Sequence, residues 1–166
     1  MQIDKLDKEY LNIVKDIIYD EDFLKLQKCS HHGISRYDHS VKVSYAAYKY
    51  ALKHHFDYDQ VAIGGLLHDF FITDNLNLFG KLKSTFNHPK KAKDNALNKY
   101  DLTAKETDII ISHMFPINLR LPKYKESWLV SLYDKKVGIM EFGNKFKYQI
   151  QYSSNLILLL ILNFVK

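Results

Sequence analysis

One stretch of the chain, residues 62–71, places a histidine and an aspartate side by side in an otherwise apolar run, at His68 and Asp69. Burying an imidazole and a carboxylate is costly unless something compensates them, and a bound metal ion is the commonest compensation for such a pair. Gly64 and Gly65 precede the pair and weaken helix propensity, which a chain tolerates where a neighbouring helix approaches closely. The stretch therefore predicts a central helix that ends at a polar site.

Composition predicts the fold class. The chain has 166 residues, 46% of them hydrophobic, which is enough for one domain with its own core. Only six glycines and three prolines occur, so long helices are favoured over many short strands. We expect an all-α, single-domain bundle of about seven helices over residues 1–166. Its core would cover about 35–142, with an N-terminal helix over 4–28 and an apolar C-terminal helix over 145–166 packed on it.

Residues that favour helix starts and breaks divide the chain further. Ser35, Asp57 and Thr103 each stand three residues before an acidic or amide side chain, which is typical of an N-terminal cap. Pro89 suits the first position of a helix, so a helix is predicted to begin at His88, after a loop over 73–87. Gly143 and Asn144 predict a break before the terminal helix.

Charge and cysteine content limit the functions that the chain can have. The net charge is +5 with neutral histidines, which suits a phosphate-bearing ligand. No dense run of Lys and Arg occurs, so a stable nucleic-acid complex is not expected. The single cysteine, Cys29, excludes an internal disulfide and a cysteine zinc cluster. It fits a reducing compartment, and we expect a cytoplasmic protein.

The chain ends do not predict a signal peptide or a membrane span. The first residues are charged and lack an apolar segment. The tail over 156–162 has seven uninterrupted apolar residues, against the roughly 20 that a bilayer crossing needs. We expect this tail to be a buried helix or a partner surface, for example in a homo-oligomer.

Residues of metal-ligand type recur about 20 to 30 positions apart, roughly one helix plus a loop. Helical bundles build metal sites in this way, with ligands projected inward from facing helices. Imidazole and carboxylate ligands without thiolate suit Fe, Mn, Zn, Ni or Co. The candidate ligands are His39, His68, Asp69, His88, His113 and Asp134.

The order and surroundings of four of these residues resemble a known family. His39 lies in YDHSV, His68 and Asp69 lie in GLLHD, and Asp134 lies in LYDK. This order is similar to the H…HD…D pattern of the HD-domain metal-dependent phosphohydrolase superfamily. The resemblance covers about residues 35–142, and it implies an all-helical fold with a metal site.

The two further histidines, His88 and His113, resemble the six-ligand variety of that family, which holds two metal ions. The resemblance then implies that Asp69 bridges the ions and that a hydroxide between them is the nucleophile. The first site would be formed by His39, His68, Asp69 and Asp134, and the second by Asp69, His88 and His113.

Two cationic residues near the ligands are candidates for substrate contacts. Arg36 stands three residues before the first ligand and could bind a phosphate through two nitrogens, while Lys135 follows the last ligand as a point charge. The expected catalytic residues are thus Asp69, Lys135 and Arg36. Many family members carry a lysine where this chain has Ile72, so that phosphate contact is absent.

We therefore expect a metal-dependent hydrolase that cleaves a phosphoester or phosphoanhydride bond in a small nucleotide-like substrate. Two alternatives remain open on the same ligands: a di-iron oxygenase and a non-catalytic nucleotide-binding regulatory module. Simpler interpretations also exist for single residues. His68 and Asp69 alone could form a hydrogen-bonded core pair, and His88 could cap a helix. His113 could be a cationic side chain that the helix dipole favours at a C-terminus.

Overall fold

The protein is an all-α bundle, as the sequence predicts. The computed structural model describes residues 6–31, 34–72 and 78–164, and over these ranges it contains seven α-helices and one short antiparallel ribbon. The elements are α1 (Lys8–Ile18), α2 (Glu21–Leu24), the 3-10 turn η2 (Lys25–Lys28), β1 (Ser30–His31), β2 (Ile34–Ser35), α3 (Arg36–Lys53), α4 (Tyr58–Leu67), α5 (Leu78–Leu97), α6 (Ala104–Ser112) and α7 (Lys125–Phe164).

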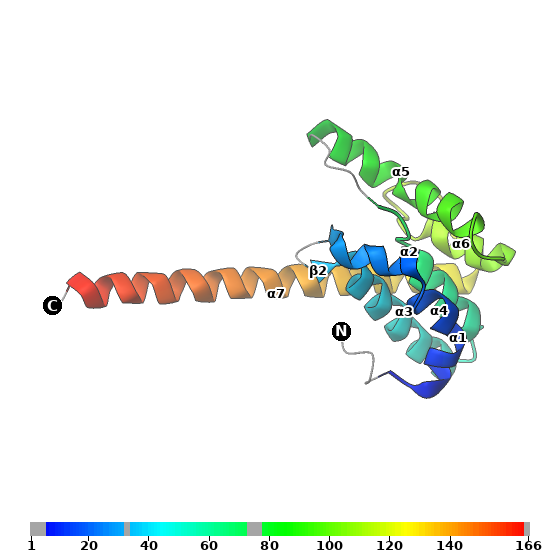
Figure 1. The fold of residues 1–166 in the computed structure, drawn as a ribbon, viewed down its shortest axis with the longest axis horizontal. Coiled ribbons are helices and arrows are strands. Elements are labelled where there is room, and N and C mark those ends of the chain that lie inside the picture. Colours follow the sequence, from blue (N-terminus) through cyan, green and yellow to red (C-terminus); the bar gives the residue numbers. More distant parts are fainter. Residues whose placement is uncertain (1–5, 32–33, 73–77, 165–166) are drawn as a thin grey trace.

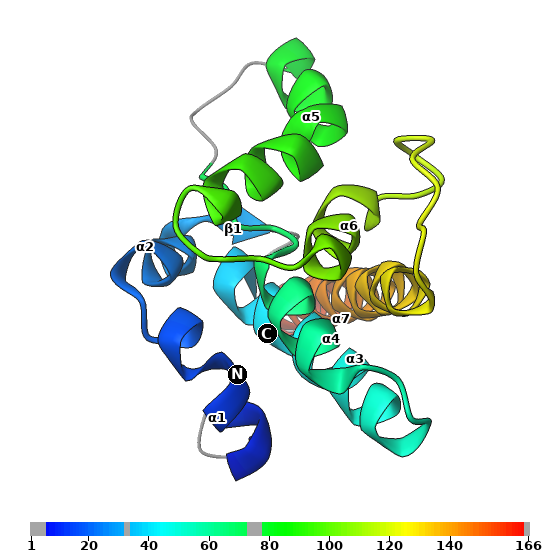
Figure 2. The same cartoon turned by 90° about the vertical axis from the view of Figure 1, so that its right-hand side faces the viewer.

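Helices α3 and α4 form the centre of the bundle, side by side (Figure 2). Helix α1 packs on one side of this pair, where Tyr10 and Val14 are fully buried. Helices α6 and α7 pack on the other side, and α5 lies across α6 (Figure 1). His68 and Asp69 follow the last residue of α4, at the C-terminal end of this central helix.

The two glycines of α4 allow the close helix contacts that the sequence predicts. A Cβ atom on Gly64 would lie 2.9 Å from Cβ of Ile109 in α6. A Cβ atom on Gly65 would lie 3.0 Å from Cα of Ser44 in α3. Since real Cβ atoms essentially never approach heavy atoms below 3.0 Å, these positions set the spacing between α4 and its two neighbours.

Two of the three predicted N-terminal caps are confirmed as side-chain caps. The Ser35 hydroxyl accepts a hydrogen bond from the amide of Asp38 at the start of α3. Thr103 forms a complete capping box at the start of α6. Asp57 does precede α4, but its carboxylate makes no cap and accepts instead from the Lys105 ammonium at 3.0 Å.

The predicted boundaries of the fifth helix are wrong. Helix α5 begins at Leu78, so the expected loop over 73–87 is helical from 78 onward, and residues 73–77 lie outside the described part of the chain. Pro89 lies inside the helix rather than at its start. An internal proline costs about 3 kcal/mol, and burial of Ala92 and Ala96 on the following turns offsets part of that cost.

The predicted break near the C-terminus is also wrong. Helix α7 runs through Gly143 and Asn144 without interruption, because one glycine costs a helix only about 1 kcal/mol. Figure 1 shows its C-terminal part projecting away from the bundle, so the backbone does not show a separate helix over 145–166 packed on the core. The tail side chains over 156–162 lie outside the described residues. Among the described helices, none combines the length and apolar character needed to cross a membrane.

Substitution of the glycine at the α4–α6 contact tests this packing. We expect Gly64→Ala to lower the free energy of unfolding by about 1–2 kcal/mol, since overpacking against Ile109 outweighs the gain in helix propensity. Gly138→Ala in α7 is the matched control, because nothing lies within 4 Å of its added Cβ. It should raise stability by about 0.5–1 kcal/mol. Urea unfolding followed by circular dichroism measures the free energy of unfolding of both variants. Equal stabilisation by Gly64→Ala and Gly138→Ala would contradict the close contact between α4 and α6.

Candidate metal centre

All six candidate ligands converge at one place in the bundle, from five different helices. His39 lies in the first turn of α3, the pair follows α4, and the remaining ligands come from α5, from the end of α6 and from α7. All are buried except Asp134, whose side chain is 14% exposed. The converging residues are His39, His68, Asp69, His88, His113 and Asp134.

A first group of possible metal ligands consists of His39, His68 and Asp134, whose ligand atoms all lie within 4.8 Å of one another. Nε2 of His39 lies 3.0 Å from Oδ1 of Asp134, and Nε2 of His68 lies 3.6 Å from the same oxygen. The three side chains thus present two imidazole nitrogens and one carboxylate oxygen to a common point.

A second group consists of His68, Asp69 and His113, again with ligand atoms within 4.8 Å of one another. His88 adjoins it. Its Nε2 lies 3.3 Å from Oδ1 of Asp69 and 2.9 Å from Nε2 of His113, which is itself 3.8 Å from Oδ1 of Asp69. His68 belongs to both groups, so the two lie side by side.

These separations agree with ligation of a transition metal. Metal–nitrogen and metal–oxygen bonds of about 2.0–2.1 Å at angles of 90–109° place neighbouring ligand atoms roughly 2.9–3.4 Å apart. The contacts around Asp134 and Asp69 range from 2.9 to 3.8 Å, so small side-chain adjustments would bring them to bonding distance. The donor set, nitrogen and oxygen without sulfur, suits the metals predicted from the sequence.

Two histidine rings are held with their Nε2 lone pairs facing this centre. Nδ1 of His68 donates to the carbonyl of Gly65 at 2.7 Å, and Nδ1 of His113 donates to the carbonyl of Ile110 at 2.7 Å. Since a carbonyl only accepts, Nδ1 carries the proton and Nε2 presents a lone pair. Nε2 of His68 is buried and makes no hydrogen bond within the described structure. A metal ion bound to this nitrogen would satisfy its lone pair.

The third ring is oriented by a residue that sequence reasoning missed. Glu141 Oε2 lies 2.9 Å from Nδ1 of His39, and its Oε1 accepts from the Lys42 ammonium at 3.0 Å. Glu141 stands seven residues after Asp134, which is two helical turns and therefore the same face of α7. This spacing was available in the sequence, since the predicted break lies after Glu141, but it becomes informative only once the ring of His39 is placed against this face of α7.

The charges of the site favour cation binding. Burial opposes protonation of His39, but the hydrogen bonds to Asp134 and Glu141 outweigh it and raise its pKa to about 9. A cation at Nε2 would take the place of that proton. Burial and the neighbouring His68 and His88 rings lower the pKa of His113 to about 3, so this ring is neutral and able to ligate.

Arg36 lies against Asp69, buried to 5% exposure. Its Nε is 3.6 Å from Oδ2 of Asp69, and its Nη1 donates to the carbonyl of Phe71 at 2.7 Å. The guanidinium also covers the Phe71 ring, which stacks on the ring of His88. Arg36 thus supports Asp69 directly and His88 through the ring of Phe71. Its predicted contact with a substrate phosphate stays a prediction.

Lys135 connects the C-terminal end of α6 to α7. Its ammonium donates to the carbonyl of His113 at 3.0 Å, and to the carbonyl and hydroxyl of Ser131 at 3.0 and 2.9 Å. Burial lowers its pKa, and the nearby Asp134 carboxylate opposes that effect. Three acceptors match the three ammonium protons, so Lys135 holds α6 against α7. Its predicted role toward substrate likewise stays a prediction.

An open pocket of about 500 Å³ lies beside Phe71, whose ring stacks on His88, and none of the six candidate ligands is among its described lining residues. Its walls combine an apolar floor with amide and charged groups, and they include Ile72, whose side chain is exposed. The described lining residues are Asp22, Leu26, Phe70, Phe71, Ile72, Asn95, Asn98 and Lys99.

Substitution of His68, which belongs to both groups of possible ligands, tests metal binding. Mn²⁺ or Co²⁺ should raise the melting temperature of the wild-type protein, because a ligand at 100 times its Kd adds about 2.7 kcal/mol of stability. His68→Ala should abolish most of this shift and reduce the bound metal found by elemental analysis. His54→Ala, at an exposed histidine that stacks on Tyr50, is the control and should behave as wild type. Equal shifts in both variants would rule out the site.

The role of Glu141 can be tested separately. Glu141→Gln keeps an acceptor for the His39 ring but loses the charge, and we expect it to weaken metal affinity by about 10- to 100-fold. Titration with Co²⁺, followed by visible absorption, gives the affinity. Lys136→Gln, on the exposed side of the same helix, should leave the titration unchanged. An unaltered affinity in Glu141→Gln would show that the carboxylate does not support the ligand.

Comparisons of the chain with protein-family models, curated proteins and solved structures found no match. The resemblance to the HD-domain superfamily therefore stays a prediction from the ordered ligand pattern. The geometry of the site carries the functional argument.

Proposed function

We propose that the protein is a metal-dependent hydrolase that cleaves a phosphoester or phosphoanhydride bond in a small nucleotide-like substrate. One observation carries the proposal: two adjoining groups of buried ligand atoms share His68, whose Nε2 makes no hydrogen bond within the described structure. A buried lone pair of this kind is expensive to leave unsatisfied unless a ligand satisfies it.

The residues of the site would hold two metal ions and keep the Asp69 carboxylate in place. Divalent cations held there would acidify a water molecule to near-neutral pKa and neutralise charge on a phosphoryl group. His39, His68 and Asp134 would hold one ion, while Asp69 with His88 and His113 would hold a second. Oδ1 of Asp69 faces the second group and Oδ2 lies near Arg36, which keeps the carboxylate in place.

The surroundings support a phosphorylated substrate of nucleotide size. The chain is basic, with a net charge of +5. The pocket beside Phe71 has a volume of about 500 Å³, within the range of small-molecule sites. Phe70 and Ile72 give it apolar surface, and Asn98 offers an amide group that suits the edge of a base, whereas Nδ2 of Asn95 already donates to the carbonyl of Phe70 at 3.1 Å.

Turnover on a panel of substrates tests the proposal. Protein loaded with Mn²⁺, Co²⁺ or Fe²⁺ should release product from at least one nucleotide, cyclic dinucleotide or diadenosine polyphosphate. Asp69→Asn should lower kcat/KM by at least about 100-fold, since loss of a mere supporting contact already costs 10- to 100-fold. His54→Ala should keep wild-type activity, because its ring stacks on Tyr50 outside the ligand cluster.

Three outcomes would contradict the proposal. Oxygen consumption by an iron-loaded sample without phosphate release would favour the di-iron oxygenase. Tight nucleotide binding without product would favour the regulatory module. Activity that survives Asp69→Asn would place the chemistry elsewhere on the chain.

A further inference from the structure

Helix α7 carries a narrow apolar face whose side chains are largely exposed in the described structure. At 100° per residue, the apolar side chains of this face lie within an arc of about 80°. The middle of this arc is roughly 130° around the helix from Asp134 and Glu141. The exposures of these apolar side chains range from 40% to 73%, and the side chains extend over roughly 27 Å of helix. We call this face the α7 stripe; it consists of Trp128, Leu132, Ile139, Phe142 and Phe146.

The α7 stripe has the spacing of a helix-pairing seam. Leu132, Ile139 and Phe146 follow one another at intervals of seven residues, and so do Trp128, Lys135 and Phe142. Together they alternate in steps of four and three, which is the a/d pattern of a coiled coil. An apolar seam of this period fits a second helix lying nearly parallel or antiparallel to α7.

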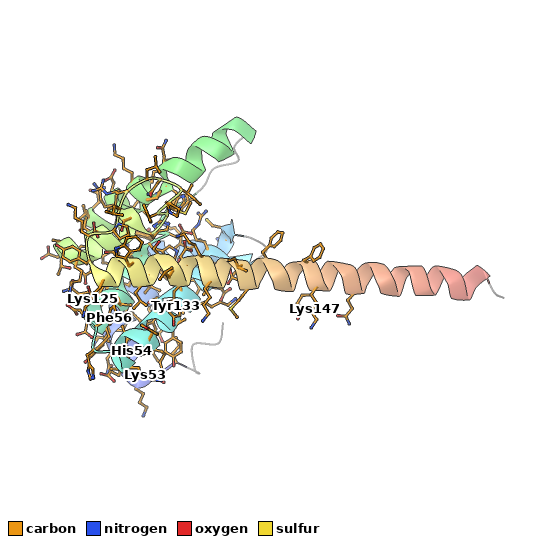
Figure 3. All side chains as sticks on the ribbon, turned by 180° about the vertical axis from the view of Figure 1, so that it is seen from behind. Lys53, His54, Phe56, Lys125, Tyr133 and Lys147 are labelled. Carbon is orange, nitrogen blue, oxygen red and sulfur yellow. The ribbon has the colours of Figure 1, made fainter. Side chains whose placement is uncertain are left out.

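The α7 stripe begins on the bundle and continues past it. Figure 3 shows Tyr133 and Lys125 over the bundle, whereas Lys147 lies on the part of α7 that has left it. At the other end, the ring of Trp128 packs edge-on against Phe115, with ring centres 5.1 Å apart. The loop that follows Phe115 exposes further apolar side chains, namely Ile117, Leu119 and Leu121.

The exposed apolar area is that of a stable interface. Large side chains at these exposures contribute on the order of 100 Å² each. The α7 stripe and the adjoining loop together therefore offer roughly 800 Å² per chain, which is the contribution of one partner to a typical specific complex. Monomers rarely leave a patch larger than about 300–600 Å² uncovered.

We propose that a second copy of this chain covers the α7 stripe, with the two α7 helices packed antiparallel about a two-fold axis. A register centred near Val137 places Leu132 opposite Phe142 of the second copy. The same register places Trp128 opposite Phe146 and Ile139 opposite Lys135. Each apolar member thus meets a partner supplied by an identical surface, as an isologous dimer requires.

The position of Lys135 selects the antiparallel orientation. An in-register parallel pair would place the two Lys135 stems opposite each other, so neither chain would supply a large apolar side chain to that layer of the seam. The antiparallel pair separates the two lysines and sets each aliphatic stem against Ile139. The ammonium of Lys135 turns toward the His113 carbonyl, so it need not enter the seam. This inference uses the outer face of α7 and is independent of the proposed activity.

Sedimentation velocity of the full chain tests the dimer. The wild type should sediment with the mass of two chains at micromolar concentration. Phe142→Glu should raise the dissociation constant at least about 100-fold, because a carboxylate would be buried at the centre of an apolar interface. Met140→Glu is the matched control: Met140 is also exposed on α7 but lies about 120° around the helix from the α7 stripe, so the dimer should persist. A monomeric wild type, or a dimer that Phe142→Glu leaves intact, would overturn the proposal.

Disulfide trapping tests the orientation. Cys29 is the chain's single cysteine, so Cys29→Ser gives a background without thiols. Leu132→Cys and Phe142→Cys are then introduced in separate chains that carry tags of different size. Under mild oxidation, the mixed sample should form the disulfide between the two different chains. Crosslinks of each variant only with itself would indicate a parallel pair and would overturn the register.

Discussion

The Asp69 carboxylate is buried at the point where helices α3, α5 and α6 meet. A buried charge needs compensation, and the bundle supplies it from several helices at once. Arg36 of α3 approaches one oxygen, while His88 of α5 and His113 of α6 face the other. Since each compensating group comes from a different helix, the packing of the bundle and the geometry of the site determine each other.

One face of helix α7 contributes side chains to the candidate metal centre, and another face carries exposed apolar side chains. Its inner face brings Asp134 to the ligand cluster and Glu141 to the ring of His39, while Lys135 fixes the end of α6 through the His113 carbonyl. Its outer face carries the α7 stripe, which continues along the helix as it leaves the bundle. A contact made by the outer face would therefore hold the same helix that positions a candidate metal ligand.

The sequence predicted the features that local chemistry determines. Ser35 and Thr103 cap helices because their hydroxyls can satisfy the first amides, and Gly64 allows a close approach because it has no Cβ. The six candidate ligands were selected because imidazoles and carboxylates recur at a spacing of one helix plus a loop, and the structure brings their side chains together. Features set by tertiary packing were missed: Pro89 lies within a helix, and neither the burial of Arg36 nor the pairing of Glu141 with His39 has a local signal.

X-ray absorption spectroscopy of the zinc- or cobalt-loaded protein shows whether the histidine cluster binds metal. We expect a first shell of nitrogen and oxygen at about 2.0–2.2 Å, with the outer-shell scattering of two or more imidazole rings per ion. The rings would belong to the histidines that converge in the bundle. A shell of oxygen atoms without imidazole scattering would contradict the account, because it would place the metal outside the histidine cluster.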